Sequence, residues 1–349
     1  MHDQPAHKPH RFAGLVSCTM HSQSENSPLE AMLLSAPFDP SEGVTVLEPP
    51  GAGAGWWVGA CSALYDEEAD AFYLYYRIRK PRELGRGVEC RIAVSRDGRS
   101  FTDIWSTTKQ ELNTPSMERA CLVKVKSGLW RLYISMVDPK DGRWRTDGME
   151  APSPDAFNPK ERWTVFTAES VNVEGVKDPW VMRIDDRYLM FLSYAPSLPK
   201  PDPELQAMMH ATQDVYNTGI TRSHTALAES TDGRSFHWIG DVLSPSEQGW
   251  DAYAARISCV VPIGNRFVAY YDGSASVAEN YEEKTGIAVS EDLRRFTRIT
   301  VDGPALTSPY GYESLRYMDV VQLERSLYFY YEYSRPDGSH ELRLSVVER

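Results

Sequence analysis

The sequence lacks any closely spaced pair of cysteines. Its five cysteines are widely separated, and none belongs to the Cys-x-x-Cys pattern of a zinc knuckle or a redox pair. Cys61, Cys121 and Cys259 fall inside apolar runs. We therefore expect them to be small buried side chains in a protein of a reducing compartment.

Positive charge is also scarce, with 37 lysines and arginines against 49 aspartates and glutamates and a net charge of -12. Such a surface repels phosphate backbones, which makes nucleic acid a poor candidate partner. No apolar stretch reaches the roughly 18 residues that a membrane span needs. The first 20 residues hold no apolar core of a signal peptide. The sequence predicts a cytoplasmic protein that acts on a small ligand, away from membranes.

The sequence contains none of the common cofactor or nucleophile motifs. A Walker loop, a G-x-G-x-x-G turn, an H-E-x-x-H pair and a G-x-S-x-G elbow are all missing. The eight histidines are scattered along the chain. We therefore predict neither a cofactor nor a metal site, and leave open only a structural cation in the channel of the fold described next.

What the sequence does contain is internal repetition, of two kinds. Three segments share a short strand, a tight polar turn and the start of another strand, and two of them use the Asp-Gly pair that favours such turns: VSRDGRSF (94–101), ESTDGRSF (229–236) and VSEDLRRF (289–296). Five longer segments share an apolar strand, a polar turn and an aromatic-rich strand, and they span residues 61–77, 120–135, 179–194, 257–272 and 317–332. In each, the first strand is nearly all apolar, as in a strand buried on both faces.

Five such units predict an all-β fold, a five-bladed β-propeller. The chain ends in HELRLSVVER, which reads as the third strand of the last blade. The segment GVTVLEPP (43–50) supplies the missing outer strand, so the N-terminal strand joins the last blade and closes the ring. We expect an N-terminal arm over 1–42 and a single propeller domain over 43–349. A β-sandwich or a solenoid is the alternative architecture.

Two regions break the repeat. Residues 136–170 read as an expanded loop in the second blade, and residues 195–223 read as an insertion in the third blade that is rich in Pro, Met and His. Long loops inside a compact domain often form lids or binding loops. A surface insertion without function is the alternative.

Charged residues interrupt the apolar pattern just before the first strand of the later blades, where burial disfavours them. Because these strands start around one mouth of a propeller channel, residues far apart in sequence converge there. The candidates are Glu118, Arg119, Asp178, Trp180, Asp251, Tyr253, Arg256, Tyr312, Glu313 and Arg316, with Trp57 from the first blade. Loops after the second strands add Arg77, Tyr271, Asp272, Glu282 and Glu283, and His224 precedes a third strand. Ion pairs that join the blades are the alternative reading of each charge.

Such a ring suits glycoside chemistry. One carboxylic acid protonates the leaving oxygen, and a second carboxylate activates water or attacks the sugar. Clustered carboxylates and arginines hold the pKa values of the two acids apart. Aromatic side chains stack on sugar faces, and arginines bind hydroxyls or a carboxylate.

The segment VKDPWVMRIDDRYLMFLSY (176–194) resembles the third-blade motif of the five-bladed glycosidases of families 43 and 32 and their relatives. The resemblance covers about residues 43–349 and includes the C-terminal YESLRYMDVV and YFYYEYSRPDGSHELRLS, which are similar to a branch of glycosidase-like propellers. It implies that Asp178 contacts the sugar and tunes the pKa of the acid. Those families also carry an Asp at the start of blade one, where this chain has GWWVGACSAL, and an acidic Glu at the start of blade four, where it has Arg256.

The sequence therefore predicts a glycoside hydrolase for small oligosaccharides or glycosides, furanosides among them. Asp178 orients the sugar, and two of Glu118, Asp251 and Glu313 transfer protons or act as nucleophile. A glycoside phosphorylase, with arginines holding phosphate, is one alternative. A propeller that binds sugar without cleaving it is the other, because the first blade lacks its carboxylate.

Overall fold

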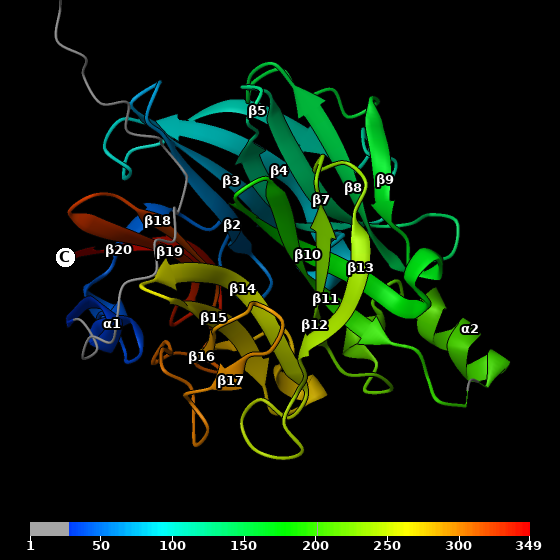
Figure 1. Ribbon diagram of the computed structural model, residues 1–349. Coiled ribbons are helices and arrows are strands. Elements are labelled where there is room, and N and C mark those ends of the chain that lie inside the picture. Colours follow the sequence, from blue (N-terminus) through cyan, green and yellow to red (C-terminus); the bar gives the residue numbers. More distant parts are fainter. Residues whose placement is uncertain (1–27, 201) are drawn as a thin grey trace, which may run out of the picture.

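The structure is a computed structural model that describes residues 28–200 and 202–349, and in these ranges the chain is nearly all β with a few short helices (Figure 1). Three antiparallel sheets have four strands each, in sequence order. In chain order these sheets are the second, third and fourth units of the fold. The second unit holds β6 (Met117–Lys124), β7 (Trp130–Val137), β8 (Trp144–Ala151) and β9 (Arg162–Phe166). The third unit holds β10 (Val173–Ile184), β11 (Arg187–Pro196), β12 (His224–Ser230) and β13 (His237–Leu243). The fourth unit holds β14 (Ala254–Ile263), β15 (Arg266–Ser274), β16 (Lys284–Ser290) and β17 (Thr297–Arg298).

The remaining eight strands form two further four-stranded units that are linked at one point. The first unit holds β2 (Trp57–Asp66), β3 (Ala71–Arg79), β4 (Gly87–Ser95) and β5 (Thr102–Thr108). The fifth unit holds β18 (Leu315–Gln322), β19 (Ser326–Ser334), β20 (His340–Glu348) and β1 (Val44–Leu47), which pairs antiparallel with β20. A parallel pairing of Trp57 with His340 links the two units. The N-terminal strand therefore completes the last unit with sequence from the opposite end of the chain.

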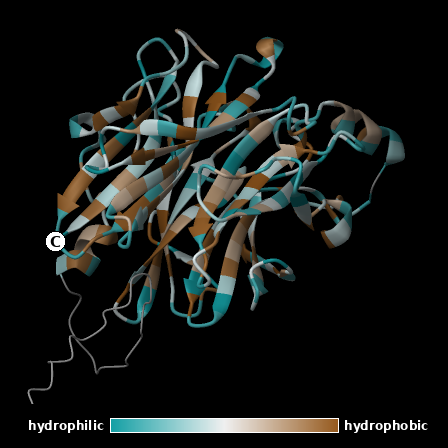
Figure 2. Cartoon of the chain, turned by 90° about the horizontal axis from the view of Figure 1, so that it is seen from above, coloured by the Kyte–Doolittle hydropathy of each residue, from teal (hydrophilic) through white to brown (hydrophobic). Residues whose placement is uncertain are grey.

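The first strands of the units pack against one another. β2 contacts β6 and β18, β10 contacts β6 and β14, and β14 contacts β18. Nearly every residue of β2, β6 and β14 is buried, which explains why these segments lack polar alternation. Figure 2 shows the resulting mixture of apolar and polar residues along the strands. The first strands thus lie at the centre of the molecule, where their polar residues meet.

Each first strand carries a bulge at the same place in its pairing with the second strand. In every case, two residues of the first strand oppose one residue of the second. The bulged pairs are Ala60–Cys61, Glu118–Arg119, Asp178–Pro179, Ile257–Ser258 and Tyr317–Met318. Ala60, Asp178 and Tyr317 have φ of 52°, 53° and 53°, a left-handed conformation that non-glycine residues rarely adopt. A bulge turns its side chains away from the regular alternation, so these positions present groups that a plain strand would hide.

The three repeated polar turns form as the sequence predicts. In each turn a serine hydroxyl donates to the side chain of an aspartate two residues later: Ser95 to Asp97, Ser230 to Asp232 and Ser290 to Asp292. In the third turn Leu293 takes the place of glycine and has φ of 63°. The side chain of Asp292 accepts hydrogen bonds from the backbone N–H groups of Arg294 and Arg295, and these bonds stabilise the turn without a glycine.

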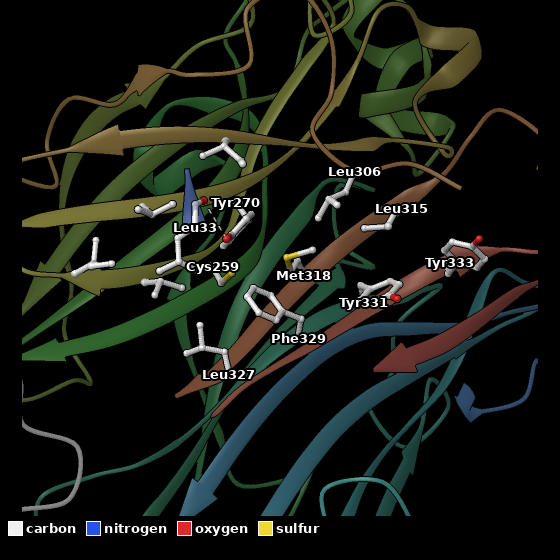
Figure 3. Close-up of a cluster of buried hydrophobic side chains, with 14 residues drawn as sticks. Leu33, Cys259, Tyr270, Leu306, Leu315, Met318, Leu327, Phe329, Tyr331 and Tyr333 are labelled. Carbon is white, nitrogen blue, oxygen red and sulfur yellow. Dashed lines mark hydrogen bonds between the residues drawn. The ribbon is translucent and has the colours of Figure 1, made fainter. Parts of the chain in front are cut away.

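Residues 28–42 pack against the fourth and fifth units. Helix α1 (Pro28–Leu33) places Leu33 in a buried cluster with residues of β14, β15, β18 and β19, and Tyr270 donates a hydrogen bond to the carbonyl of Leu33 (Figure 3). The ring of Phe38 stacks on Tyr331 at 5.4 Å. The boundary predicted at residue 43 falls just before β1, and the rest of the predicted arm, residues 1–27, lies outside the described residues.

The predicted expanded loop at 136–170 is wrong. It contains β8 and β9, the third and fourth strands of the second unit. β8 pairs with β7 over its whole length, from Trp130–Ala151 to Val137–Trp144. Its sequence WRTDGMEA carries charged residues on one face, which bind one another across the sheet and conceal the strand pattern.

The predicted insertion at 195–223 folds onto the second unit. It contains α2 (Pro203–Ala211) and the short 3-10 turn η4 (Val215–Asn217), and Met209, Val215 and Tyr216 are buried with Val137 and Trp144. α2 lies at the margin of the molecule (Figure 1). The other 3-10 turns are η1 (Pro40–Glu42), η2 (Arg82–Leu84), η3 (Glu169–Val171) and η5 (Val277–Glu279). The insertion therefore brings residues 214–217 next to the centre of the fold.

Cys61, Cys90, Cys121 and Cys259 are buried and unoxidised, as the sequence predicts for three of them. Cys18 lies outside the described residues. None of the helices in the described ranges has the length and apolar character needed to cross a bilayer.

Candidate active site

Six buried charged side chains form a continuous chain of ion pairs at the centre of the fold. They come from four of the five units and alternate in sign. In order, the chain runs through Glu118, Arg77, Glu332, Arg316, Glu283 and Arg256. Arg77 and Glu332, which are bonded directly, lie 255 positions apart in the sequence. The fold thus gathers charges that the sequence places far apart.

Arg77 and Arg316 each bind two carboxylates of the chain. Arg77 Nη1 donates to Glu118 Oε2 at 2.8 Å, and its Nη2 donates to Glu332 Oε2 at 2.9 Å. Arg316 Nη2 donates to Glu332 Oε1 at 2.7 Å, and its Nη1 donates to Glu283 Oε2 at 2.5 Å. Charge-assisted bonds of this kind satisfy ions that burial would otherwise make very costly.

The other end of the chain is held by the insertion and by the loop before β16. Arg256 Nη1 donates to Glu283 Oε1 at 2.7 Å, its Nε donates to Ser223 at 2.7 Å, and its Nη2 bonds Asn280. Asn280 in turn donates to the carbonyl of Tyr216 at 3.0 Å. The insertion therefore fixes the position of Arg256.

A histidine extends the network toward the pairing of β2 with β20. His340 Nδ1 lies 2.8 Å from Glu332 Oε1, and its Nε2 lies 2.9 Å from Glu282 Oε2. The ring of Trp57 stacks on His340 with centroids 4.3 Å apart. His340 therefore covers one face of the Trp57 ring, and that face cannot stack on a sugar.

The ion pairs set the charge state of the glutamates. Burial alone would raise the pKa of Glu118, but Arg77 and Lys177 outweigh it and lower the pKa to about 2. Burial acts in the same way on Glu332, and Arg316 and Arg77 again hold its pKa well below the usual range. Both carboxylates are ionised at neutral pH.

Asp178 is a buried carboxylate that the network does not satisfy. Its side chain is 3% exposed, and neither oxygen accepts a hydrogen bond within the described part of the chain. Lys177 Nζ lies 3.2 Å from Oδ2, close enough for an ion pair but without hydrogen-bond geometry. The backbone N–H of Asp178 is held by the hydroxyl of Ser135 at 2.6 Å. The strand bulge therefore fixes this carboxylate in place and leaves both oxygens available to a ligand.

Two tyrosines connect Asp178 electrostatically to the ion-pair chain. Burial, followed by the charges of Asp178 and Glu118, raises the pKa of Tyr317 far above its usual value. Burial and then Asp178 do the same for Tyr216, whose ring lies 5.1 Å from Lys177 Nζ. The carboxylates of Asp178 and Glu118 thus act on the same phenol.

Asp272 differs from the glutamates because no arginine in the described ranges binds it directly. Burial and then the charge of Glu283 raise its pKa to about 7, although Arg119 opposes this. One of its oxygens accepts the backbone N–H of Tyr317 at 3.0 Å. Asp272 therefore carries a proton over much of the neutral range, beside glutamates that do not.

A second buried pair lies behind this cluster. Arg119 Nε donates to the carbonyl of Cys61 at 3.0 Å, and the charge of Asp319 acts on Arg119. Asp319 accepts the backbone N–H of Ala63 at 2.8 Å and the indole of Trp180 at 2.9 Å. The predicted ligands Arg119 and Trp180 are thus bound to the protein itself.

The structure separates four predicted residues from the cluster. Tyr312 and Glu313 are exposed by 57% each, and Glu313 lies 3.3 Å from Lys284. Asp251 is buried but accepts Arg298 at 2.6 Å and Tyr271 at 3.0 Å. His224 bonds Asp241 and Ser244, and it contacts none of the six ion-paired residues. A fifth predicted residue, Tyr253, is buried and donates to the carbonyl of Tyr216 at 2.8 Å.

No family model matches the sequence, and no curated protein matches it. Solved structures do match. A glycoside hydrolase has a TM-score of 0.67 and 10% identity, and the match covers 89% of this chain and 92% of that one. A putative glycosidase from Bacteroides thetaiotaomicron has a TM-score of 0.62 and 15% identity, covering 92% and 99%. A β-1,2-mannobiose phosphorylase from Listeria innocua, in complex with β-1,2-mannobiose, has a TM-score of 0.58 and 15% identity, covering 87% and 94%.

The chain shares the fold of carbohydrate-active enzymes. At these identities the likeness concerns the fold alone, so the function has to be argued from the site.

Sequence reasoning missed three members of the site. Glu332 binds two arginines and a histidine, yet it lies inside the aromatic run YFYYEYS of β19. A carboxylate in the middle of such a strand is itself a signal of a buried partner. His340 and Tyr317 carry no comparable signal, because a lone His or Tyr beside a strand is common.

The described residues offer no obvious cation site. In the ranges 28–200 and 202–349, no group of three or more His, Cys, Asp or Glu side chains has an arrangement that would hold a metal ion. The glutamates of the ion-pair chain are instead bound to arginines. The chemistry open to this site is proton transfer and anion or hydroxyl binding by side chains.

Proposed function

We propose that the five four-stranded units are the blades of one five-bladed β-propeller over residues 43–349. The contacts among β2, β6, β10, β14 and β18 support a radial arrangement around these strands. The pairing of β1 with β20 supports closure of the ring by the N-terminal strand. In such an arrangement the bulges of the first strands face a common axis, which explains how four units contribute to one chain of ion pairs.

We further propose that the protein is a cytoplasmic glycoside hydrolase acting on small oligosaccharides or glycosides, without a cofactor. The observation that carries this is the state of Asp178: a buried carboxylate, held in a left-handed bulge, with both oxygens unbonded among the described residues. Strained positions that keep an unsatisfied polar group are typical of functional sites. Asp178 would bind sugar hydroxyls at the centre of the site.

The cluster around Asp178 offers the two protonation states that hydrolysis requires. Asp272, with a pKa of about 7, would protonate the leaving oxygen, and ionised Glu118, with a pKa of about 2, would activate water or attack the sugar. Asp251 and Glu313 fit these roles less well, because Asp251 is bound by Arg298 and Tyr271, which lie outside the ion-pair chain, and Glu313 is exposed.

A glycoside phosphorylase is the second candidate function. It is favoured by the density of buried arginines around the same carboxylates, since phosphate would need such donors. One of the structures with the same fold is a phosphorylase. The two reactions differ only in whether water or phosphate receives the glycosyl group.

The test is turnover of a panel of aryl glycosides, furanosides included, with and without inorganic phosphate. The wild type should release the aryl group from at least one substrate, and Asp178→Asn should be reduced by at least about 100-fold. The matched control Asp302→Asn removes a carboxylate from an exposed loop and should keep full activity. Turnover that requires phosphate would support phosphorolysis. A wild type that binds sugar but turns over nothing would indicate a non-catalytic propeller, and one that does neither would refute the proposal.

A further inference from the structure

Arg79, at the end of β3, is a buried arginine without a counter-ion among the described residues. Its side chain is 2% exposed, and within the same ranges its Nε has no hydrogen-bond partner. Across residues 28–200 and 202–349, no ion pair or side-chain hydrogen bond of its guanidinium is found. An isolated buried charge is strongly destabilising unless something compensates it.

The neighbouring arginines show what a satisfied position looks like in this fold. Arg77 lies two residues earlier in β3 and binds two glutamates, and Arg316 likewise binds two. Burial lowers the pKa of Arg79. Tyr281 and the charge of Glu118 oppose this effect, and the charges of Arg77 and Arg316 add to it. The three glutamates of the ion-pair chain are already matched by the three arginines that bind them, so Arg79 is an additional positive charge beside that chain.

Aromatic rings hold the guanidinium of Arg79 in position. It lies 4.2 Å from the ring centroid of Trp57 and 4.1 Å from that of Tyr281. Tyr281 is itself fixed, because its hydroxyl donates to Asp214, which also binds Arg86 at 2.8 Å. Stacking of this kind orients an arginine and partly compensates its buried charge. It uses the faces of the guanidinium and leaves the N–H groups at its edge unused.

We propose that Arg79 is the anchor of an oxyanion subsite next to the carboxylate cluster, which takes either a carboxylate carried by a sugar or a phosphate. The planar edge of a guanidinium, with Nε and one Nη side by side, matches two oxygens of such a group. The inference rests on the proposed function only in assigning the anion to a sugar substrate or to the co-substrate of its cleavage. Binding of the anion itself is independent of turnover.

The experiment is isothermal titration calorimetry of the full chain with three compounds: D-glucuronate, inorganic phosphate and neutral D-glucose. Wild type should bind glucuronate or phosphate more tightly than glucose, and Arg79→Gln should bind that anion about 10- to 100-fold more weakly. The control Arg82→Gln removes a positive charge from an exposed position in η2 and should leave the affinity unchanged. Tighter binding of glucuronate assigns the subsite to an acidic sugar, and tighter binding of phosphate assigns it to phosphorolysis.

Thermal unfolding without ligand separates this role from a purely structural one. Arg79→Gln should lower the melting temperature less than Arg77→Gln, because the Arg77 variant loses two ion pairs that Arg79 does not make. Arg79→Lys, which keeps the charge, serves if the glutamine variant does not fold, and it should retain part of the anion affinity.

Equal affinity of wild type for glucose and for both anions overturns the inference, as does unchanged anion binding by Arg79→Gln. Cleavage of neutral aryl glycosides alongside such a result would leave the proposed function standing, so the two failures are distinguishable.

Discussion

Ala60 and Asp178 occupy the same place in two different sheets. Each is the first residue of a two-residue bulge in a first strand, and their φ angles are 52° and 53°. Both bulges therefore direct a side chain out of the regular pattern, but only the one in β10 carries a carboxylate. The chemistry of the site thus has to come from Asp178 and its neighbours, and not from a carboxylate in β2.

Asp178 should be more important for turnover than for stability. In Asp178→Asn the side chain keeps its size and its tolerance of the left-handed backbone, while the buried charge and its ion pair with Lys177 are lost. Because neither oxygen accepts a hydrogen bond from the described residues, we expect the free energy of unfolding, measured by urea denaturation, to fall by less than in the control described next. Glycoside turnover should fall as described above.

Asp319→Asn is the matched control, since Asp319 is also a buried aspartate of a first strand but accepts three hydrogen bonds. It should be destabilised by about 1–3 kcal/mol. A loss of stability in Asp178→Asn as large as that in Asp319→Asn would show that Asp178 is structural.

The ion-pair chain should contribute strongly to stability. Glu332→Gln removes a charge that binds Arg77, Arg316 and His340 at the centre of the fold. We expect a loss of about 3–5 kcal/mol, because uncompensated arginines remain buried. Glu48→Gln breaks an exposed pair with Arg335 and should change stability by less than about 1 kcal/mol. Equal effects of the two variants in chemical denaturation would contradict a structural role for the chain.

Asp272 should make stability fall with rising pH. In the folded protein its carboxyl keeps the proton up to about pH 7, whereas in the unfolded chain it loses the proton near pH 4. Between these values the folded state binds more protons, so the contribution of Asp272 decreases as pH rises from about 4 to 7, by up to about 1.4 kcal/mol per pH unit. Asp272→Asn removes this dependence.

Urea denaturation of wild type and Asp272→Asn across that window measures the difference. The variant should gain stability relative to wild type as the pH rises. A constant difference between the two proteins from about pH 4 to pH 8 would show that Asp272 is ionised in the folded state. The exposed Asp302→Asn serves as control and should follow wild type at every pH.

Helix α2 should be held to the third unit by Glu174 of β10. His210 Nε2 lies 2.7 Å from one oxygen of Glu174, and Gln206 donates to the other at 2.8 Å. His210→Ala removes one of these contacts and should speed amide hydrogen exchange in residues 203–212 more than in the strands. The exposed His237→Ala should not. Exchange that rises equally throughout the chain would indicate a global effect instead.

The repeats made most of the strands predictable. The aromatic second strands recur along the chain. The turns that contain Asp97, Asp232 and Asp292 recur as well, and each lies between two strands as expected. The strands β8 and β9 were missed because Asp147 binds Arg145 in the same strand and Arg162 in the neighbouring strand, and these charges conceal the pattern. Local pairing of charges thus overrides the apolar alternation on which strand prediction depends.

The site was predictable from two signals. Arg77, Asp272, Glu282 and Glu283 were predicted from their place after the second strands, and the structure places them in or beside the ion-pair chain. The other signal is a charge that interrupts an apolar strand. Glu118, Asp178, Arg256 and Arg316 carry this signal, and the structure buries all four. Tyr312 and Glu313 carry it as well, but they belong to the loop before β18, and the path of a loop is not set by strand periodicity. The lack of a counter-ion at Arg79 among the described residues depends on every neighbouring side chain and has no trace in the sequence.

The most direct test of the account is a crystal structure of Asp178→Asn soaked with an oligosaccharide or glycoside that the wild type cleaves. The account predicts a sugar within hydrogen-bond distance of the residue 178 side chain, with Glu118 and Asp272 on opposite sides of the scissile bond. A sugar bound only at the outer edge of the sheets, or five units that do not surround a common axis, would contradict it.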